Sequence, residues 1–210
     1  MDHTRLFQFY SCFSPKQVRE FSDFVRSPFF NKRNYLASLT DYLAISQKTT
    51  KSKFVKETAF EKMYPGKAYD DQKMRLAMSN LLKLMEQYVA HRSFDEDTFE
   101  KRLRVLNFCR EANLPKYFEH LLKGLQSWQT QQPARNAEYF DTRVKLMQEM
   151  FLQQSAGQRT AYDLQEVSDT LDLAYLSHKL RQTCQLLNIR SVLKIEFDSG
   201  MLEEVLSYIE

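Results

Sequence analysis

A three-part signal for a helix start recurs along this chain. It consists of an aromatic residue, a helix-capping residue, and an apolar residue four positions into the helix. In this arrangement, known as the hydrophobic staple, the aromatic side chain packs on the apolar one while the cap accepts a backbone N–H. The signal predicts five helix starts, at Phe13-Ser14, Phe30-Asn31, Tyr69-Asp70, Phe94-Asp95 and Phe197-Asp198. A chain marked in this way is expected to be built from helices.

Apolar residues after these starts recur with the period of an α-helix, as Met74, Leu81 and Met85 do. Only four glycines and five prolines interrupt the 210 residues, which favours helices over a turn-rich β fold. Residues 190–196 fit either a helical turn or an extended connector. We predict helices at residues 15–26, 32–45, 55–64, 71–92, 96–112, 116–129, 137–153, 161–187 and 199–209.

Two predicted helices after residue 95, at 96–112 and 137–153, carry apolar residues on two sides. In the helix at 96–112, Phe99 and Leu103 belong to one stripe, and Val105 and Phe108 belong to a second. Such a helix is expected between two neighbours. The predicted fold class is therefore all-α, with a compact N-terminal helical domain followed by stacked antiparallel helical hairpins. The hairpins resemble a degenerate tetratricopeptide array, although the 34-residue signature of that repeat is absent.

Charge divides the chain into two parts. Residues 1–94 hold 16 basic and 9 acidic side chains, a net charge of +7, whereas residues 95–210 hold 14 and 18, a net charge of −4. This difference indicates that the two parts meet different partners. We predict a basic helical domain at residues 1–94 and a helical-hairpin domain at residues 95–210.

The sequence favours a cytoplasmic protein that is not attached to a membrane. No stretch approaches 18 consecutive apolar residues, and the N-terminus lacks a basic segment followed by an apolar run. The three cysteines, Cys12, Cys109 and Cys184, are odd in number and far apart, so we expect reduced thiols.

Catalytic, cofactor-binding and metal-binding motifs are not recognisable in the sequence. The four glycines are isolated, which excludes the usual glycine-rich phosphate loops, and the four histidines lack a second ligand at metal-binding spacing. His178 and Cys184 lie six residues apart on one predicted helix and point in different directions, so they do not form a nucleophile pair. We therefore expect no enzymatic activity, no metal and no cofactor.

Four carboxylates occupy the first half of the helix predicted at residues 161–187. Near a helix N-terminus they stabilise the helix dipole, and as one face they offer a surface to a cation or a basic partner. Both interpretations remain open. The residues are Asp163, Glu166, Asp169 and Asp172.

The predicted helices between residues 32 and 94 follow the order of a helix-turn-helix domain. Four cations at the last turn and on the last helix, off its apolar stripe, are candidate nucleic-acid contacts: Lys67, Lys73, Arg75 and Lys83. The connecting turn is longer than in the usual motif, and a solvated helix face explains the same residues.

The helix predicted at residues 199–209 ends without a capping residue. We expect its apolar face either to pack back on the helix at 161–187 or to meet another chain. That chain is a second copy of the protein or a continuation of the polypeptide. The candidate interface consists of Leu202, Val205, Leu206 and Ile209.

Several motifs resemble those of an uncharacterised family of helical bacterial proteins. They are Phe-Ser-Pro-Lys at 13–16, Arg-Ser-Pro-Phe-Phe-Asn-Lys at 26–32, Tyr-Pro-Gly-Lys-Ala-Tyr-Asp-Asp-Gln-Lys at 64–73 and Leu-Arg-Gln-Thr-Cys-Gln-Leu-Leu-Asn at 180–188. The resemblance implies a compact helical domain followed by hairpins, with further helices beyond, and implies no activity. A more distant similarity links residues 34–94 to the winged-helix part of bacterial transcriptional activators, which implies a wing of two short strands at residues 89–94.

The leading hypothesis for function is a non-catalytic protein-interaction module whose hairpins hold a protein or a peptide. The alternative is a nucleic-acid-binding protein, similar to a transcription regulator, that uses residues 1–94. An enzyme of unrecognised type is the third hypothesis. Self-association through the C-terminal helix remains open in each case.

Overall fold

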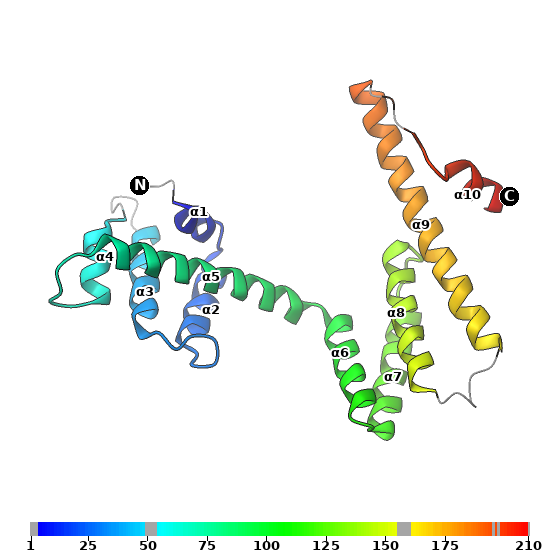
Figure 1. The fold of residues 1–210 in the computed structure, drawn as a ribbon, viewed down its shortest axis with the longest axis horizontal. Coiled ribbons are helices and arrows are strands. Elements are labelled where there is room, and N and C mark those ends of the chain that lie inside the picture. Colours follow the sequence, from blue (N-terminus) through cyan, green and yellow to red (C-terminus); the bar gives the residue numbers. More distant parts are fainter. Residues whose placement is uncertain (1–3, 49–53, 155–160, 195, 197, 210) are drawn as a thin grey trace. The chain divides into compact units, whose positions relative to one another are not determined.

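The computed structural model describes residues 4–48, 54–154, 161–194, 196 and 198–209. All regular secondary structure in these residues is α-helical, which confirms the predicted all-α fold class (Figure 1). The chain divides into two compact units, Met1–Glu96 and Asp97–Glu210. This division falls two residues after the predicted domain boundary.

The first unit begins its helices largely where capping residues predict. Gln17 N–H donates to Ser14 Oγ at 3.3 Å and Ser14 N–H donates to Gln17 Oε1 at 2.8 Å, a complete capping box. Asp70 Oδ1 accepts from Lys73 N–H at 3.0 Å at another helix start. Both predicted starts are confirmed. The helices of this unit are α1 (Arg5–Ser11), α2 (Pro15–Arg26), α3 (Asn34–Lys48), α4 (Lys56–Met63) and α5 (Asp71–Glu96).

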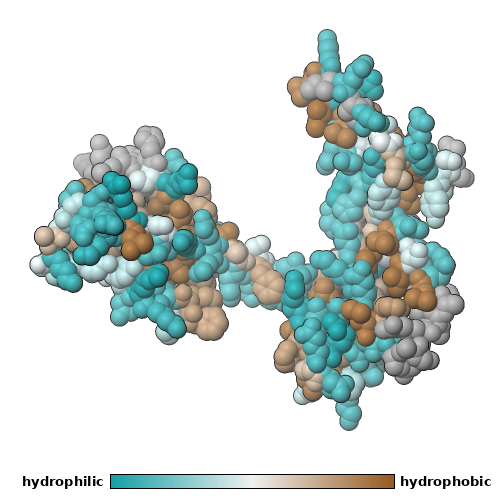
Figure 2. Space-filling model, in the orientation of Figure 1, coloured by the Kyte–Doolittle hydropathy of each residue, from teal (hydrophilic) through white to brown (hydrophobic). Residues whose placement is uncertain are grey.

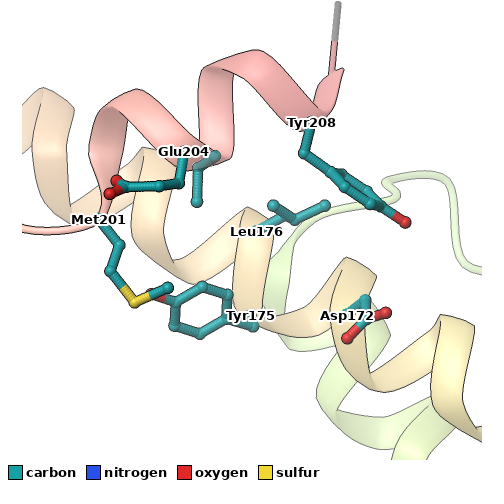
Figure 3. A pocket seen from close by; sticks show the side chains of 7 residues that line it. Asp172, Tyr175, Leu176, Met201, Glu204 and Tyr208 are labelled. Atoms are coloured by element: carbon teal, nitrogen blue, oxygen red, sulfur yellow. The ribbon is translucent and has the colours of Figure 1, made fainter.

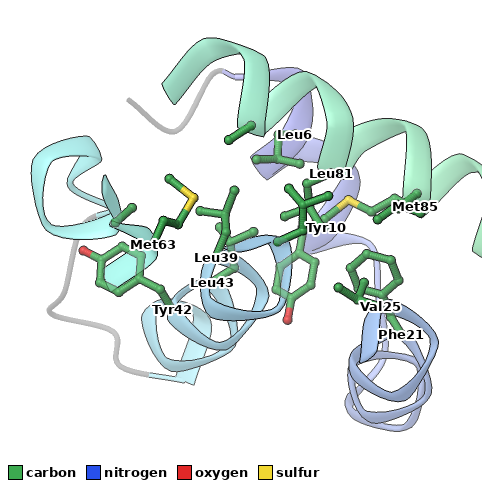
Figure 4. Packing of buried hydrophobic residues seen from close by; sticks show 14 of the residues in the cluster. Leu6, Tyr10, Phe21, Val25, Leu39, Tyr42, Leu43, Met63, Leu81 and Met85 are labelled. Carbon is green, nitrogen blue, oxygen red and sulfur yellow. The ribbon is translucent and has the colours of Figure 1, made fainter. Parts of the chain in front are cut away.

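The core of the first unit lies under α5, whose predicted apolar stripe is buried. Leu81 and Met85 point toward side chains from α1 and α3, such as Tyr10 and Leu39 (Figure 4). Each large apolar side chain removed from water in this way contributes about 1.5–3 kcal/mol before the entropic cost of ordering. The position of α5 is therefore fixed by one continuous stripe.

The end of α5 differs from the prediction. The staple at Phe94-Asp95 predicts a helix start there, but α5 continues through Glu96 and the next helix is capped by Asp97. An Arg92–Glu96 pair at 3.0 Å, one turn apart, supports the longer helix. Residues 89–94 are helical, so the expected wing of two strands is also wrong.

Two further differences concern short segments. Helix α1 was not predicted, because seven residues are too few to show a clear period. Asn31 Oδ1 accepts from Arg33 N–H at 2.9 Å and forms a turn, so α3 begins later than expected, at Asn34. The predicted staple residue Phe197 lies outside the described residues.

The second unit consists of two pairs of neighbouring helices and a short last helix. The pairs are α6 with α7 and α8 with α9, and α8 also contacts both α6 and α7. Its core includes Leu106, Leu125 and Leu146, with the Trp128 ring stacked on Phe99 at 5.1 Å. The helices are α6 (Thr98–Glu111), α7 (Pro115–Thr130), α8 (Ala137–Gln153), α9 (Ala161–Leu193) and α10 (Leu202–Ile209).

The two helices predicted to have two apolar sides, α6 and α8, differ in how many of these sides are packed. Helix α8 lies between neighbours, as predicted. Helix α6 buries only its stripe of Phe99, Leu103 and Leu106, because α7 and α8 pack on that side. Val105 is half exposed and Phe108 is 63% exposed, so the prediction of a second packed side is wrong for α6 within the described residues.

Candidate protein-binding groove

Helix α9 is held on α8 by polar pairs along its length. Arg143 Nη2 lies 2.9 Å from Glu166 Oε1, and His178 Nε2 lies 2.8 Å from Asp141 Oδ2. Arg181 pairs with Glu138. A hydrogen bond from the backbone and, second, this pairing lower the pKa of the Glu138 carboxyl. One face of α9 is thus committed to α8, and another face remains for α10.

The chain reverses direction after α9 through two residues with left-handed backbone. Lys194 has a φ of 54°, and its N–H donates to Arg190 O at 2.9 Å, which ends the helix. Gly200 has a φ of 56°, and its N–H donates to Asp198 Oδ1 at 2.8 Å. Of the two interpretations left open for residues 190–196, the helical one holds through Leu193.

A groove of about 220 Å³ lies between α9 and α10 (Figure 3). Its lining is mostly apolar, and Tyr175 Oη donates to Met201 Sδ at 3.4 Å across it. Two carboxylates, Asp172 from α9 and Glu204 from α10, complete the lining. The apolar and aromatic lining residues are Tyr175, Leu176, Met201, Val205 and Tyr208.

The two carboxylates that line the groove have no cationic partner among the described residues. Asp172 and Glu204 form no ion pair there, whereas Glu166 pairs with Arg143. Asp169 accepts from Gln165 Nε2 at 2.6 Å. The side chain of Asp163 lies outside the described residues. Of the three of these carboxylates whose side chains the structure describes, only Asp172 therefore belongs to the groove.

The four residues of the predicted C-terminal interface do not form one free face. Val205 is 3% exposed and Leu202 is half-buried, because α10 packs back on α9. Leu206 and Ile209 remain 45% and 53% exposed. Of the two alternatives for this face, packing back on α9 therefore occurs at Val205, and contact of the exposed residues with another chain stays a prediction. Of the four residues, only Val205 lines the groove.

Sequence reasoning missed most of the groove lining on α9. Asp172 and Leu176 lie four residues apart, as do Met201 and Val205, and Glu204 and Tyr208. This i,i+4 spacing places each pair on one helical face. The spacing is a usable signal, but the sequence left the meeting of the two helices as one of two alternatives.

A second exposed apolar group lies at the C-terminal end of α9. Brown atoms gather at this end of the helix, at the top of Figure 2. The exposed side chains are Leu187, Ile189, Val192 and Leu193. They lie beyond the groove, and none of them lines it.

The four predicted nucleic-acid contacts are all exposed but are not brought together. Lys73 pairs with Asp70 at 3.1 Å and Arg75 pairs with Asp71 at 2.6 Å. Lys67 Nζ lies 5.7 Å from the centroid of the Tyr64 ring. Lys83 follows Arg75 by eight residues, roughly 12 Å along α5.

The carboxylates beside these cations are firmly ionised. The backbone N–H of Lys73, followed by its ammonium group, lowers the pKa of Asp70. The Tyr69 hydroxyl, followed by Arg75, lowers the pKa of Asp71. Lys73 and Arg75 are therefore largely neutralised by their own helix start, which weakens the predicted nucleic-acid site at this position.

His178 is the one described histidine with both a carboxylate and a guanidinium partner. Arg181 Nη2 donates to His178 Nδ1 at 3.0 Å, so Nδ1 is the acceptor nitrogen of the ring. The other nitrogen, Nε2, therefore carries the hydrogen and donates it in a hydrogen bond to the Asp141 carboxylate. Both ring nitrogens are occupied, and Cys184 is an exposed thiol that makes no contact with them in the described part of the chain. The trio joins α8 to α9.

The described residues contain no group of three histidine, cysteine or acidic side chains able to hold a metal ion. No helix in the described ranges has the length and apolar character needed to cross a membrane. Cys12, Cys109 and Cys184 are free thiols.

Comparison with known proteins adds no relative. No protein family, no curated protein and no solved structure matches the chain.

Proposed function

We propose that this chain is a non-catalytic protein-binding module whose α9–α10 groove holds an amphipathic helix from a partner protein. The observation that carries the proposal is an apolar groove flanked by two carboxylates that form no ion pair within the described part of the chain. The helical pairs α6–α7 and α8–α9 act as the support for this groove, in the manner of a tetratricopeptide-like array.

The shape and lining of the groove favour apolar side chains. Its volume of about 220 Å³ suits one large aromatic or two aliphatic side chains rather than a small polar molecule. The lining from Leu176, Met201 and Val205 provides apolar contact, and the rings of Tyr175 and Tyr208 add flat surfaces. Helix-in-groove recognition uses such anchors at a spacing of three or four residues.

The charges at the groove indicate the sign of the partner. Asp172 and Glu204 lie in the lining of the groove. A partner helix with lysine or arginine beside its apolar stripe gains attraction there, whereas an acidic helix is repelled. We propose a basic amphipathic segment as the ligand and the cytoplasm, where the three thiols stay reduced, as the compartment.

The proposal is tested with a fluorescein-labelled amphipathic peptide of about 18 residues that has leucines on one face and lysines on the other. Fluorescence anisotropy measures its binding to the full chain, beside a peptide in which every lysine is glutamate. We expect the basic peptide to bind and the acidic peptide not to bind. The substitution Glu204→Lys is expected to weaken binding of the basic peptide about tenfold, close to the cost of one lost charge pair plus one repulsive pair.

Glu203→Lys is the matched control, because it makes the same charge change on the same helix outside the lining. Tyr208→Ala tests the apolar contact without changing charge. Equal losses from Glu203→Lys and Glu204→Lys, or unchanged binding by Tyr208→Ala, would show that the groove is not the binding site. Preference for the acidic peptide would contradict the charge argument.

A further inference from the structure

A cleft in the first unit gathers three cations that the sequence places on two separate segments. Lys32 and Arg33 come from the connection between α2 and α3, and Lys83 comes from the middle of α5. The cleft has a volume of about 340 Å³, in the range of small-ligand sites, which begins at roughly 300 Å³. No carboxylate is among its described lining residues.

The cations of the cleft differ from Lys73 and Arg75 in having no counter-charge. Lys32, Arg33 and Lys83 are exposed and form no ion pair with any described residue. Three like charges around one hollow repel one another and are stabilised by an anion placed between them. The cleft thus concentrates positive charge in the unit that carries most of the basic residues of the chain.

An aromatic ring is displayed at the same cleft. Phe29, in the connection between α2 and α3, is 84% exposed. Its ring meets Phe30 edge to face at 4.9 Å, and Phe30 stacks on the buried Phe24 at 3.9 Å with an interplanar angle of 17°. The next residue in the chain, Asn31, fixes the loop by donating from Nδ2 to Val25 O at 2.8 Å. Phe29 is therefore held outward by its neighbours.

Polar amides complete the lining. Asn80 and Gln87 on α5 flank Lys83, one before it and one after it, and Asn80 Nδ2 also donates to Tyr35 Oη at 3.3 Å. Amides recognise the edges of bases by donating and accepting hydrogen bonds. Cations, amides and an exposed ring are together the groups that bind a phosphate and a stacked base.

We propose that this cleft binds single-stranded nucleic acid, with phosphates at Lys32, Arg33 and Lys83 and one base stacked on Phe29. Stacking on an exposed ring requires an unpaired base, so a single strand fits and a duplex does not. Of the four nucleic-acid contacts predicted from the sequence, only Lys83 belongs to the cleft. The proposal concerns a different unit and a different ligand from the α9–α10 groove.

The test uses fluorescence anisotropy of the full chain with a labelled single-stranded oligonucleotide of about ten nucleotides, as DNA and as RNA. The competitors are the matching duplex, a free mononucleotide and polyglutamate. We expect the single strands to bind and the affinity to fall with salt concentration. The triple variant Lys32→Gln, Arg33→Gln and Lys83→Gln is expected to lose at least tenfold in affinity and to flatten the salt dependence.

Two comparisons distinguish binding at the cleft from non-specific attraction to the positive charge of the first unit. The control Lys73→Gln with Arg75→Gln removes two cations of the same unit outside the cleft and is expected to change affinity less than about twofold. Phe29→Ala is expected to weaken binding about tenfold with an unchanged salt dependence, and Phe29→Tyr to restore it. Circular dichroism of each variant checks that the fold is kept.

The proposal is overturned by absent binding at low salt, or by equal losses in the cleft and control variants. Preference for the duplex, or no effect of Phe29→Ala, would indicate contact with the backbone alone. Equal affinity for the mononucleotide would indicate a free nucleotide as ligand, and competition by polyglutamate would indicate an acidic protein. Failure here leaves the groove proposal unaffected, because that assay depends on Glu204 and Tyr208.

Discussion

Tyr88 Oη donates a hydrogen bond to Glu20 Oε2 at 2.8 Å and thereby joins α5 to α2. Burial, followed by this bond, raises the pKa of Tyr88 to about 12, and the bond also lowers the pKa of Glu20. The Tyr88 ring contacts Phe13 and Phe21 at 5.6 and 5.5 Å between centroids. Tyr88 therefore contacts the apolar core through its ring and the charged side chain of Glu20 through its hydroxyl.

Replacing Tyr88 by phenylalanine is expected to lower the melting temperature of the first unit by roughly 3 °C, because the ring contacts stay and only the hydroxyl is lost. Circular dichroism melts measure the change. The same substitution on a Glu20→Gln background is expected to have a smaller effect, since the carboxylate acceptor is already absent. Equal effects on the two backgrounds would show that the hydroxyl acts without Glu20.

The stability that this pair provides is expected to depend on pH in a defined direction. The folded-state pKa of Glu20 is lowered, so its contribution is complete above the ordinary carboxyl pKa and is lost as pH falls through the lowered value. The raised pKa of Tyr88 keeps the donor protonated well above pH 10. Urea titrations are therefore expected to separate wild type from Tyr88→Phe most at pH 7 and less as the pH falls below the ordinary carboxyl pKa. A difference that stays constant over this fall in pH would contradict the linkage.

Asp97 is the cap of α6 and is expected to contribute to the stability of the second unit. Its Oδ1 accepts from Glu100 N–H at 2.8 Å, so Asp97→Ala is expected to cost about 1 kcal/mol in urea unfolding. Asp97→Asn and Asp97→Ser are expected to recover most of this loss, because both side chains also cap helices. A larger loss from Asp95→Ala than from Asp97→Ala would support the helix start predicted from the sequence.

The contrast between Ser14 and Asp97 explains what the sequence can predict about helix starts. Ser14 is followed by Pro15 and Gln17, which fit the first and third helical positions and leave one choice. Around residue 95 the segment Asp95-Glu96-Asp97 offers three acidic residues in a row, and the rule for caps does not choose between two aspartates. Which aspartate caps α6 depends on how far α5 continues beyond Arg92, and that is decided by the packing of the folded unit.

The two units are expected to unfold separately. Trp128, the only tryptophan of the chain, stacks on Phe99 in the second unit, so its fluorescence reports that unit, while circular dichroism reports both. Leu81→Ala in the first unit is expected to cost about 2–5 kcal/mol and to shift part of the dichroism transition without moving the fluorescence midpoint.

Leu106→Ala makes the same change at a fully buried site of the second unit and is the matched variant. It is expected to lower the fluorescence midpoint by a similar free energy, about 2–5 kcal/mol. If Leu81→Ala lowers the fluorescence midpoint as much as Leu106→Ala does, the two units unfold as one cooperative block.

The candidate sites were less predictable than the fold, for a geometric reason. The apolar stripe of a helix is a short-range pattern in the sequence, so helices such as α2 and α8 could be predicted from it. The groove requires α10 to fold back on α9, which depends on left-handed backbone at Lys194 and Gly200. The cleft brings Lys32 beside Lys83, fifty-one positions later in the sequence, through the packing of α5. The apolar face of the C-terminal helix left its folding back as one of two alternatives, whereas the juxtaposition in the cleft arises from tertiary contacts that no local pattern encodes.

The last prediction separates the role of Val205 from that of its neighbour Leu206. Val205 is buried against α9 and Leu206 faces solvent, although the two are adjacent on one short helix. Val205→Asp is expected to detach α10, because a carboxylate cannot be buried there without a partner. The groove, which needs both helices, should then be lost.

Limited proteolysis measures the detachment, and the basic amphipathic peptide measures the groove. Val205→Asp is expected to speed cleavage near α10 and abolish peptide binding, while the Trp128 unfolding midpoint stays within about 0.5 kcal/mol of wild type, since α10 lies outside the core that holds the tryptophan. Leu206→Glu introduces the same kind of charge one position later and is expected to leave cleavage and peptide binding unchanged. Rapid cleavage of Leu206→Glu, or peptide binding by Val205→Asp, would mean that α10 is not held on α9 through Val205.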